Sequence, residues 1–373
     1  MTSQHLNGYG LQLSGGGARA AYQIGVLKAV AELYPRNHGL PFPILCGTSA
    51  GAINAVTLAC YASCFHLGVR KLEYIWRHFQ THQVYRADPV GVSRQLLRLL
   101  HRGDGKPPSL FDSAPLRDLI HQVLPLERLE RHIEQGYLRA VTLSATRYYH
   151  PCSVSFYQGH PEIVPWRRSR RFGQPTTITA EHLMASAAIP FVFPSIQLDN
   201  DHYGDGSVLQ MSPLSPPIHL GAERILVVNL DSPHRALPLT QRRRAPDSSD
   251  IAGHLLDTIF SDTLNSDLER LERINRSLSL IPPKQRPSQP LKVIETLVLK
   301  PSEDIDAIAR QHYRKLPWAV RWMLKGIGVD GDSESSLLSY MMFEAPYCST
   351  LIELGYHDAL ARQGELKHFF RLN

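Results

Sequence analysis

The sequence predicts an α/β protein with a three-layer α/β/α core, in which helices cover both faces of a mostly parallel sheet. The main observation is a pattern that occurs twice in the first 60 residues: a short apolar strand, a glycine-rich turn and a helix. Two such units in succession are typical of parallel strands joined by crossover helices. Residues 224–230 have the length and composition of a further buried strand.

The two repeated units set the expected order of elements. In the first, a strand at 10–13 leads through a glycine loop into a helix over 18–33. In the second, a strand at 43–46 and a tight turn lead into a long helix within the apolar stretch 50–68. Polar residues interrupt that stretch, so a core helix fits it better than a membrane span.

The rest of the chain predicts one catalytic domain with additions. Between 70 and 230 we expect helices and loops, a hairpin of strands at 137–145 and 153–157, a short helix over 181–188, and a strand–turn–strand segment at 196–203. The domain prediction divides the chain into three parts: a catalytic domain at 8–232, a basic Pro/Arg-rich linker or loop at 233–250, and a mainly helical region at 251–373 that packs on or caps the core.

The composition is that of an ordinary globular protein with a mild excess of positive charge. Hydrophobic residues make up 43% of the chain, charged residues 20%, and the formal net charge is +6. Five irregularly spaced cysteines predict reduced thiols and a cytoplasmic location, and the first ten residues do not predict a signal peptide. Metal-ligand spacing and nucleic-acid-binding signatures are absent from the sequence, so we expect no metal, no cofactor and no nucleic-acid partner. Peripheral contact with the inner face of a membrane remains open.

The turn of the second unit matches the G-x-S-x-G pattern of a nucleophile elbow. In such a turn a serine stands clear of the backbone between a strand and a helix, where only small neighbours are tolerated. The free N–H groups at the helix start favour negative charge there. Ser49 is therefore the candidate nucleophile. The elbow residues around it are Gly47, Thr48, Ala50 and Gly51.

The glycine loop of the first unit is a candidate oxyanion hole. Consecutive glycines let the backbone turn several N–H groups toward one point. Such donors stabilise the oxyanion of a tetrahedral intermediate, and the loss of one costs about 3 kcal/mol of barrier height. A phosphate-binding loop is the alternative, but the spacing G-x-x-x-x-G-K-[ST] is absent. The candidate residues are Gly15, Gly16, Gly17, Ala18 and Arg19, the last either adding positive charge or forming a salt bridge beneath the loop.

The dipeptide Asp205-Gly206, followed by Ser207, is the third motif. It follows a strand-like segment and precedes a proline-rich loop. A carboxylate at this position could accept the Ser49 proton directly or through water, but Asp-Gly is also a frequent turn pair. Asp205 is thus a candidate base, and the evidence for this role depends on the presence of the other two motifs.

Together the three motifs resemble those of the patatin-like phospholipase family, which carries G-G-G-x-[RK]-G, G-x-S-x-G and D-G-[AG]. The matching segments here are 15–20, 47–51 and 205–207, and further agreement occurs at 185–190 and 221–228. The resemblance extends over about residues 8–232, with a weaker likeness at 351–359. Two positions depart from the pattern: Ala20 replaces the glycine after the basic residue, and Ser207 follows Asp-Gly. A positive φ at Ala20 would strain the loop.

The resemblance implies a patatin-like core and a Ser49–Asp205 dyad without a catalytic histidine. It further implies a phospholipase A or lysophospholipase that cleaves fatty acyl esters of phospholipid or lysophospholipid through an acyl-enzyme. The acyl position, the headgroup and the oligomeric state do not follow from the sequence.

Two other functions remain as alternatives. An α/β-hydrolase-type esterase or thioesterase would add a histidine to the serine and the aspartate. The candidates for that histidine are His202, His219, His234 and His254. An inactive lipid-binding regulatory protein is the other alternative, and loss of ester hydrolysis in Ser49→Ala separates it from both enzymes.

Two segments suggest contact with lipid. Residues 166–172 place four arginines between a tryptophan and a phenylalanine, which fits either anionic headgroups or a plain exposed loop. Trp318 and Trp322 lie on a helical stretch rich in arginine and lysine, which fits an interfacial helix, a cap over the acyl site or core packing.

Overall fold

A computed structural model gives the fold. It describes residues 8–86, 109–231 and 263–372, without 283, 286–290, 327 and 332–334, and between the last two ranges it describes 233, 251, 253, 255, 257 and 258. The predicted linker at 233–250, apart from residue 233, lies outside the described residues, as do His234 and His254.

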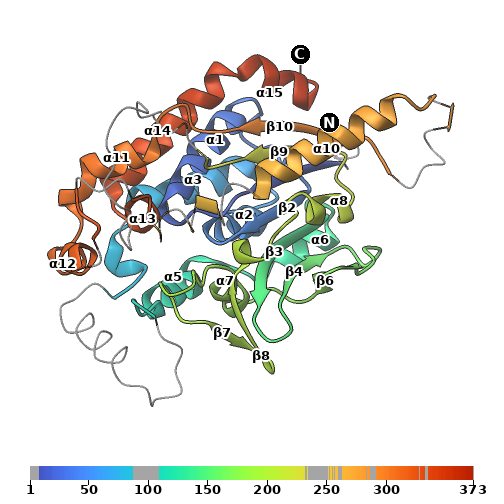
Figure 1. Ribbon diagram of the computed structural model, residues 1–373. Helices are drawn as coiled ribbons and strands as arrows, with labels where there is room; N and C mark the ends of the chain where they lie inside the picture. Colours follow the sequence, from blue (N-terminus) through green and yellow to red (C-terminus); the bar gives the residue numbers. More distant parts are fainter. Residues whose placement is uncertain are drawn as a thin grey trace, which may run out of the picture.

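A ten-stranded sheet forms the centre of the molecule (Figure 1). Its strands are β1 (Tyr9–Leu13), β2 (Ile44–Thr48), β3 (Ala140–Arg147), β4 (Cys152–Gly159), β5 (Arg167–Arg168), β6 (Arg171–Pro175), β7 (Ile196–Leu198), β8 (Asp201–Asp205), β9 (Arg224–Val228) and β10 (Glu295–Leu299). The main path runs β10-β9-β1-β2-β3-β4-β6-β5. The strands from β10 to β3 are parallel, whereas β4 and β8 both pair with β3 antiparallel. The predicted mostly parallel sheet is confirmed.

Helices cover the sheet and make up most of the described C-terminal region. The α-helices are α1 (Ala21–Glu32), α2 (Ala50–Cys60), α3 (Phe65–Arg77), α5 (Ala114–Val123), α6 (Arg128–Glu134), α7 (Ala180–Ser186), α8 (Ser215–His219), α10 (Thr263–Ser279), α11 (Ile305–His312), α12 (Trp318–Gly326), α13 (Leu337–Met341), α14 (Ala345–Ala361) and α15 (Gln363–Phe370). Short 3₁₀ helices are η2 (Gly17–Ala20), η3 (Thr81–Gln83), η4 (Gly206–Val208) and η7 (Tyr313–Lys315). Among the described residues, no helix is both long and apolar enough to span a membrane.

The alternation of side chains along the parallel strands creates the three layers (Figure 1). In β9, Leu226 and Val228 point to the larger core beneath α1, α2, α3 and α14. Ile225 and Val227 point to the opposite face, where a smaller core includes residues of α8 and α10. A strand buried on both faces reads as a continuous apolar run, which explains why this strand was predictable from its composition.

The C-terminal region packs directly on the first helix. α14 crosses α1 at backbone contact distance, since a Cβ on Gly25 would lie 1.9 Å from the carbonyl oxygen of Ile352. A Cβ on Gly355 would lie 2.1 Å from the carbonyl oxygen of Tyr22. β10 comes from the same region and pairs with β9 at the edge of the sheet. The boundary predicted at 251 remains a prediction.

Two predicted elements differ from the structure. The long helix predicted within 50–68 is two helices, α2 and α3, because the chain leaves helical geometry between Tyr61 and Cys64. Gly68 then packs against Tyr61, at a distance of 3.2 Å between its Cβ position and the tyrosine Cβ. The helical stretch predicted at 303–327 is likewise divided into α11, η7 and α12. Apolar periodicity does not reveal such breaks, because both helices of each pair bury their apolar faces.

Candidate active site

Ser49 occupies a sharp turn between β2 and α2. Its backbone has φ 55° and ψ −129°, which is unusual for a residue with a side chain. The neighbouring glycines make this turn sterically feasible. A Cβ on Gly47 would lie 2.3 Å from the carbonyl oxygen of Gly51, and a Cβ on Gly51 would lie 2.5 Å from that of Leu13. The G-x-S-x-G spacing therefore reflects the close packing of this turn against β1.

Ser186, at the end of α7, holds the Ser49 backbone in place. The Ser49 N–H donates to Ser186 Oγ at 3.0 Å, and this hydroxyl donates in turn to the carbonyl oxygen of Ser144 in β3 at 2.6 Å. A buried strained backbone persists only where its surroundings support it. Ser186 lies in the segment 185–190 that contributes to the family resemblance, but its role in holding the turn was not predicted from the sequence.

Gln210 supports the same turn from the other side. Thr48 Oγ1 donates to Gln210 Oε1 at 2.7 Å, and Gln210 Nε2 donates to Ser144 Oγ at 2.8 Å. The three side chains are buried. Sequence reasoning also missed Gln210, and no motif could have marked it, because its role depends on the antiparallel return of β8 beside β3.

Asp205 ends β8, where it pairs with Ala145 of β3. Its N–H donates to the carbonyl oxygen of Ala188 at 2.8 Å, and its Oδ1 accepts a hydrogen bond from the Ser207 N–H at 2.9 Å. The side chain is fully buried. Ser49 and Asp205, which the family resemblance pairs as a dyad, thus lie at the same end of the sheet.

Burial dominates the electrostatics of Asp205. Loss of solvation raises the pKa of the carboxyl from 3.8 to about 6, while the Ser49 hydroxyl and the Ser207 groups oppose the rise. Ser49 is therefore close enough to act on the charge of the carboxyl. Oδ2 has no hydrogen-bond partner of ordinary length and angle among the described residues. This oxygen is consequently free to accept a proton.

The glycine loop follows β1 at the same end of the sheet as Ser49. Gly17 adopts φ +54°, and a Cβ there would lie 2.3 Å from the carbonyl oxygen of Tyr340. Ala20 has φ −64°, so the substitution at this position causes no strain. Within the described structure, the N–H groups of the buried residues 15–18 donate no hydrogen bond to another backbone group. Because buried N–H groups are almost always paired, such a run of donors is typical of an anion site.

Arg19 forms a salt bridge beneath the loop, which was one of its two predicted roles. Its guanidinium donates to Asp306 Oδ1 at 2.7 Å, to Ser339 Oγ at 2.7 Å and to Asp257 Oδ1 at 3.3 Å. It also lies 3.9 Å from the ring centroid of Tyr340. Its backbone N–H donates to the carbonyl oxygen of Gly16. The backbone N–H of Arg19 and most of its guanidinium N–H groups are therefore bonded within the protein, and its place in the oxyanion hole stays a prediction.

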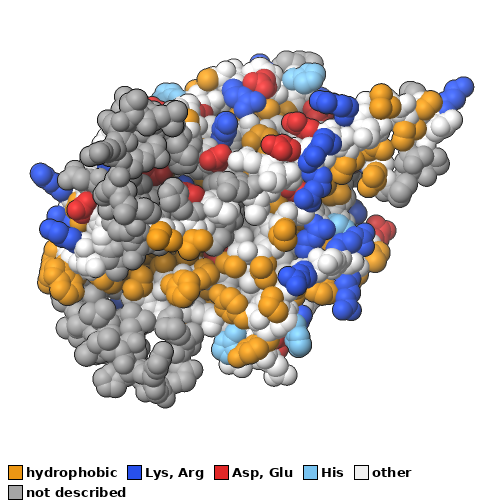
Figure 2. All heavy atoms as spheres, in the orientation of Figure 1, with side chains coloured by type: hydrophobic (Ala, Val, Ile, Leu, Met, Phe, Trp, Pro, Cys, Tyr) orange, Lys and Arg blue, Asp and Glu red, His pale blue; other side chains and the backbone are white. Residues whose placement is uncertain are grey.

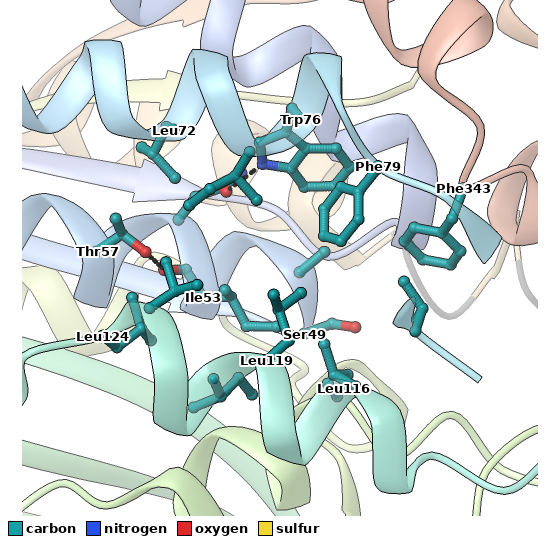
Figure 3. A pocket seen from close by; sticks show the side chains of 18 of the residues that line it. Ser49, Ile53, Thr57, Leu72, Trp76, Phe79, Leu116, Leu119, Leu124 and Phe343 are labelled. Atoms are coloured by element: carbon teal, nitrogen blue, oxygen red, sulfur yellow. Dashed lines mark hydrogen bonds between the residues drawn. The ribbon is translucent and has the colours of Figure 1, made fainter. Parts of the chain in front are cut away.

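An apolar pocket opens beside Ser49 and Gly17. Figure 3 shows its walls: Leu116 and Leu119 of α5 on one side of Ser49, and on the other Trp76 of α3 and Phe79, which follows that helix. α2 contributes one face of its helix, Ser49, Ile53 and Thr57, which spans about 12 Å at 1.5 Å per residue. The further lining residues are Ala50, Asn54, Leu72, Ile75, Val84, Ile120, Val123, Leu124, Ala187, Ile189, Phe193 and Phe343.

The few polar groups of this pocket are bonded to the protein itself. Thr57 Oγ1 donates to the carbonyl oxygen of Ile53 at 2.7 Å, and Asn54 Oδ1 accepts a hydrogen bond from the indole N–H of Trp76 at 2.9 Å (Figure 3). The cavity therefore presents an apolar surface to its contents, with the Ser49 hydroxyl at one end. Such a pocket fits a hydrocarbon chain attached to a polar reacting group.

The two described histidines among the triad candidates lie away from the dyad. His202 contacts Ser195 at 3.3 Å, and His219 hydrogen-bonds the backbone oxygen of Ser215 and stacks on Trp166. Neither contributes to the pKa of Asp205. The histidine positions at 234 and 254 lie outside the described residues, so the geometry bears only on the other two.

The sequence matches the model of a known protein family. The model of the patatin-like phospholipases matches residues 11–218, more than half of the sequence. The chain belongs to the patatin-like phospholipase family, and this membership supports activity as a lipid hydrolase. The match ends before the C-terminal region that holds Asp306 and Tyr340.

Solved structures with a similar fold include human GIVD cytosolic phospholipase A2, at 13% identity and a TM-score of 0.47, covering 100% of this chain and 61% of the human chain. VipD from Legionella pneumophila is 11% identical with a TM-score of 0.42, covering 96% of this chain and 67% of that one. The chain thus spans about two thirds or less of the length of these proteins. A sequence search against curated proteins found no match.

Proposed function

We propose that the protein hydrolyses fatty acyl esters of glycerophospholipids through a Ser49–Asp205 dyad. The observation that carries the proposal is the meeting of three features at one end of the sheet: a strained serine, a buried carboxyl whose pKa responds to it, and an apolar pocket. The pocket would hold the acyl chain and leave the ester at Ser49.

In the first half-reaction, Ser49 Oγ attacks the ester carbonyl carbon, and its proton passes to Asp205 Oδ2. The N–H groups of residues 15–18 hold the resulting oxyanion. When the tetrahedral intermediate collapses, the bond to the glycerol oxygen breaks and that oxygen takes the proton from Asp205. An acyl-enzyme remains on Ser49.

In the second half-reaction, water attacks the acyl carbon and gives its proton to Asp205. Collapse releases the fatty acid, and Ser49 Oγ recovers the proton. A base works best when its pKa is near the operating pH. A pKa of about 6 leaves Asp205 mostly ionised at neutral pH and still able to return its proton.

The test combines a covalent probe with lipid assays. We expect a fluorophosphonate to label Ser49 and the wild type to release fatty acid from phosphatidylcholine or lysophosphatidylcholine. Ser49→Ala and Asp205→Asn should each lower the rate by about a thousandfold or more while the fold is retained. Ser277→Ala, an exposed serine on α10, is the matched control.

Each alternative function predicts a different result. If His202→Ala or His219→Ala lost activity as completely as Asp205→Asn, a Ser-His-Asp triad would replace the dyad. If the probe failed to label Ser49 and lipids still bound, the protein would be a lipid-binding regulator without activity.

We also propose that α12 provides peripheral contact with the inner, cytoplasmic face of a membrane. Trp318 and Trp322 lie one turn apart and are 63% and 65% exposed, whereas Val320 and Leu324 of the same helix are buried. Lysine and arginine flank them at Arg321 and Lys325, with no ion pair to a described carboxylate. Exposed tryptophans beside basic residues are typical of interfacial helices.

The membrane contact has its own test. Trp318→Ala/Trp322→Ala should weaken binding to anionic vesicles and hydrolysis of vesicle lipids, while hydrolysis of a short water-soluble ester stays unchanged. Leu280→Ala, directly after the end of α10, is the matched control, since this side chain is 82% exposed. Equal vesicle binding by both variants would contradict the role of α12.

A further inference from the structure

A basic surface groove lies where the β5–β6 hairpin meets the end of β3. Its lining includes Arg147, Arg167, Arg170, His150 and Phe172. A second depression adjoins it and shares three of these residues. Figure 2 shows Lys and Arg side chains gathered on this part of the surface, over β4 and β6. The motif at 166–172, which the proposed catalytic chemistry does not use, thus forms part of a concave site.

The hairpin brings the arginines together around one ring. In β6, Phe172 pairs with Arg167 of β5 and with Val154 of β4. The guanidinium carbon of Arg167 lies 5.1 Å from the centroid of the Phe172 ring, and that of Arg147 lies 5.8 Å from the same centroid. Two like charges therefore contact the same aromatic ring.

The positive charge of the groove is poorly balanced. Arg147 has one carboxylate partner, Asp201 at 3.7 Å, and its buried Nε has no hydrogen-bond partner in the described structure. Neither Arg167 nor Arg170 forms an ion pair with a carboxylate of the described residues. Like charges that share a concave surface repel each other unless an anion joins them. Guanidinium pairs of this kind suit the oxygens of a phosphate group, which they bind in a bidentate way.

The aromatic residues of the motif differ from the sequence-based expectation. Trp166 does not reach the surface: it is 7% exposed and stacks between Tyr157 and His219. It also fills the space above Gly173, where a Cβ would lie 2.2 Å from its ring. Trp166 therefore packs beneath the hairpin and holds it in place, while Arg167, Arg168 and Arg170 are exposed to the solvent. This arrangement favours recognition of a charged group over insertion into hydrocarbon.

The groove lies close to the candidate active site. Arg147 pairs with Tyr203 of β8, two residues before Asp205, which places it about 7 Å along the strand at 3.4 Å per residue. The next residue, Tyr148, packs its hydroxyl against Gly204. Burial and the charge of Asp205 both raise the pKa of this tyrosine. In a glycerophospholipid the phosphate is also only a few bonds from the ester, so one lipid surface can occupy both places.

We propose that this groove binds the phosphate of an anionic phospholipid headgroup at the membrane surface. The inference deepens the proposed function, because it names the substrate surface, but binding can be measured without hydrolysis. The phosphate of phosphatidic acid, which is a monoester with up to two negative charges, is the group that the guanidinium groups of one groove complement best.

The experiment uses the full chain carrying Ser49→Ala, so that no lipid is consumed. Binding to phosphatidylcholine vesicles is compared with binding to vesicles that also contain phosphatidic acid or phosphatidylglycerol. Arg167→Gln/Arg170→Gln removes two charges from the groove, and Arg273→Gln/Arg276→Gln removes two exposed charges from α10 as the matched control. Thermal unfolding verifies that both variants fold.

We expect the groove variant to lose about tenfold or more of its affinity for phosphatidic acid vesicles, because hydrogen bonds to charged groups are stronger than neutral ones. The control should retain its affinity, and phosphatidylglycerol should bind more weakly than phosphatidic acid. An equal loss in both variants would show a general effect of surface charge and overturn the proposal.

Two further outcomes are informative. One distinguishes a lipid phosphate from free phosphate as the ligand, and the other distinguishes failure of the hydrolase proposal from failure of the groove proposal. If inorganic phosphate alone binds the groove more tightly than the vesicles do, the ligand is a free anion and the lipid assignment is wrong. If vesicles bind as expected but the wild type releases no fatty acid, the groove stands and the proposed hydrolase activity fails. With a water-soluble ester, Arg167→Gln/Arg170→Gln should keep the wild-type rate.

Discussion

One buried charged side chain lies beside each of the two glycine turns. The two charges differ in the number of partners that surround them. Arg19, after the first turn, is surrounded by two carboxylates, a hydroxyl and an aromatic ring. Asp205, beside the second turn, has no cationic partner among the described residues, and its Oδ2 has no hydrogen-bond partner of ordinary length and angle there. A paired charge stabilises the fold, whereas an unpaired one is typical of a reactive group.

The two turns also differ in where their support comes from. The serine turn is held by residues of the catalytic core, above all Ser186 and the carbonyl oxygen of Ser144. The glycine loop is held by the C-terminal region: Ser339 lies 320 positions and Asp306 287 positions from Arg19 in the sequence. The nucleophile is therefore positioned within the core, and the oxyanion loop depends on the docking of α11 and α13.

The largest effect should follow from breaking the Arg19 cluster. Asp306→Asn leaves a buried guanidinium with a weaker partner, which should lower the free energy of unfolding by about 3–5 kcal/mol. Because the loop carries the proposed oxyanion donors, we also expect kcat to fall more than KM changes. Chemical denaturation and steady-state kinetics measure the two effects.

Asp304→Asn is the matched control for this variant. Asp304 caps the same helix by accepting hydrogen bonds from the N–H groups of residues 306 and 307, and asparagine caps a helix about as well as aspartate, so this replacement should cost less than about 1 kcal/mol. Equal kcat values in the two variants would mean that α11 does not position the glycine loop.

The second predicted effect is an increase in the free energy of unfolding instead of a decrease. A rise of the Asp205 pKa from 3.8 to about 6 corresponds to about 3 kcal/mol by which ionisation opposes folding. Asp205→Asn should therefore stabilise the protein above pH 6 while abolishing activity. Between pH 6 and pH 3.8 the native carboxyl is protonated and the unfolded one is still ionised, so the gain should shrink. Below pH 3.8 it should vanish.

Thermal unfolding across this pH range measures the difference between Asp205→Asn and the wild type. A gain in stability that stayed constant down to pH 3 would show that the charge of Asp205 is not its cause. In the wild type, the same titration predicts an acidic limb of kcat/KM near pH 6, because the base must be ionised.

The smallest effect should come from the serine turn itself. Ser186→Ala removes the acceptor of the Ser49 N–H, which should cost about 1–3 kcal/mol of stability. Fluorophosphonate labelling of Ser49 should slow, because the strained turn loses its support. Ser195→Ala, a half-buried serine that contacts His202, serves as the comparison. Unchanged labelling in Ser186→Ala would show that the local glycines alone hold the turn.

The membership in the patatin-like family and the mostly parallel sheet were predictable because their signals are local. A strand, a glycine turn and a helix follow one another within about 20 residues in each unit, and the packing of adjacent turns demands glycine at 47 and 51. Asp205 needed the resemblance in addition, since Asp-Gly alone is a common turn.

Other features had no local signal. The break between α2 and α3 was hidden by a continuous apolar stretch, and the burial of Trp166 depends on His219 and Tyr157 from separate elements. Gln210 supports the serine turn only because β8 returns antiparallel to β3. Contacts between distant segments are set by how the whole chain packs, which a short window of sequence does not contain.

The sequence by itself determined the two glycine turns, the strands and helices around them, and thereby the candidate nucleophile and its class of protein. Only the tertiary structure decided that Arg19 is a paired structural charge and that Asp205 is an unpaired one. The reason is that the state of a buried charge depends on its partners in space. Those of Arg19 lie in the C-terminal region, and the described structure brings no cation to Asp205.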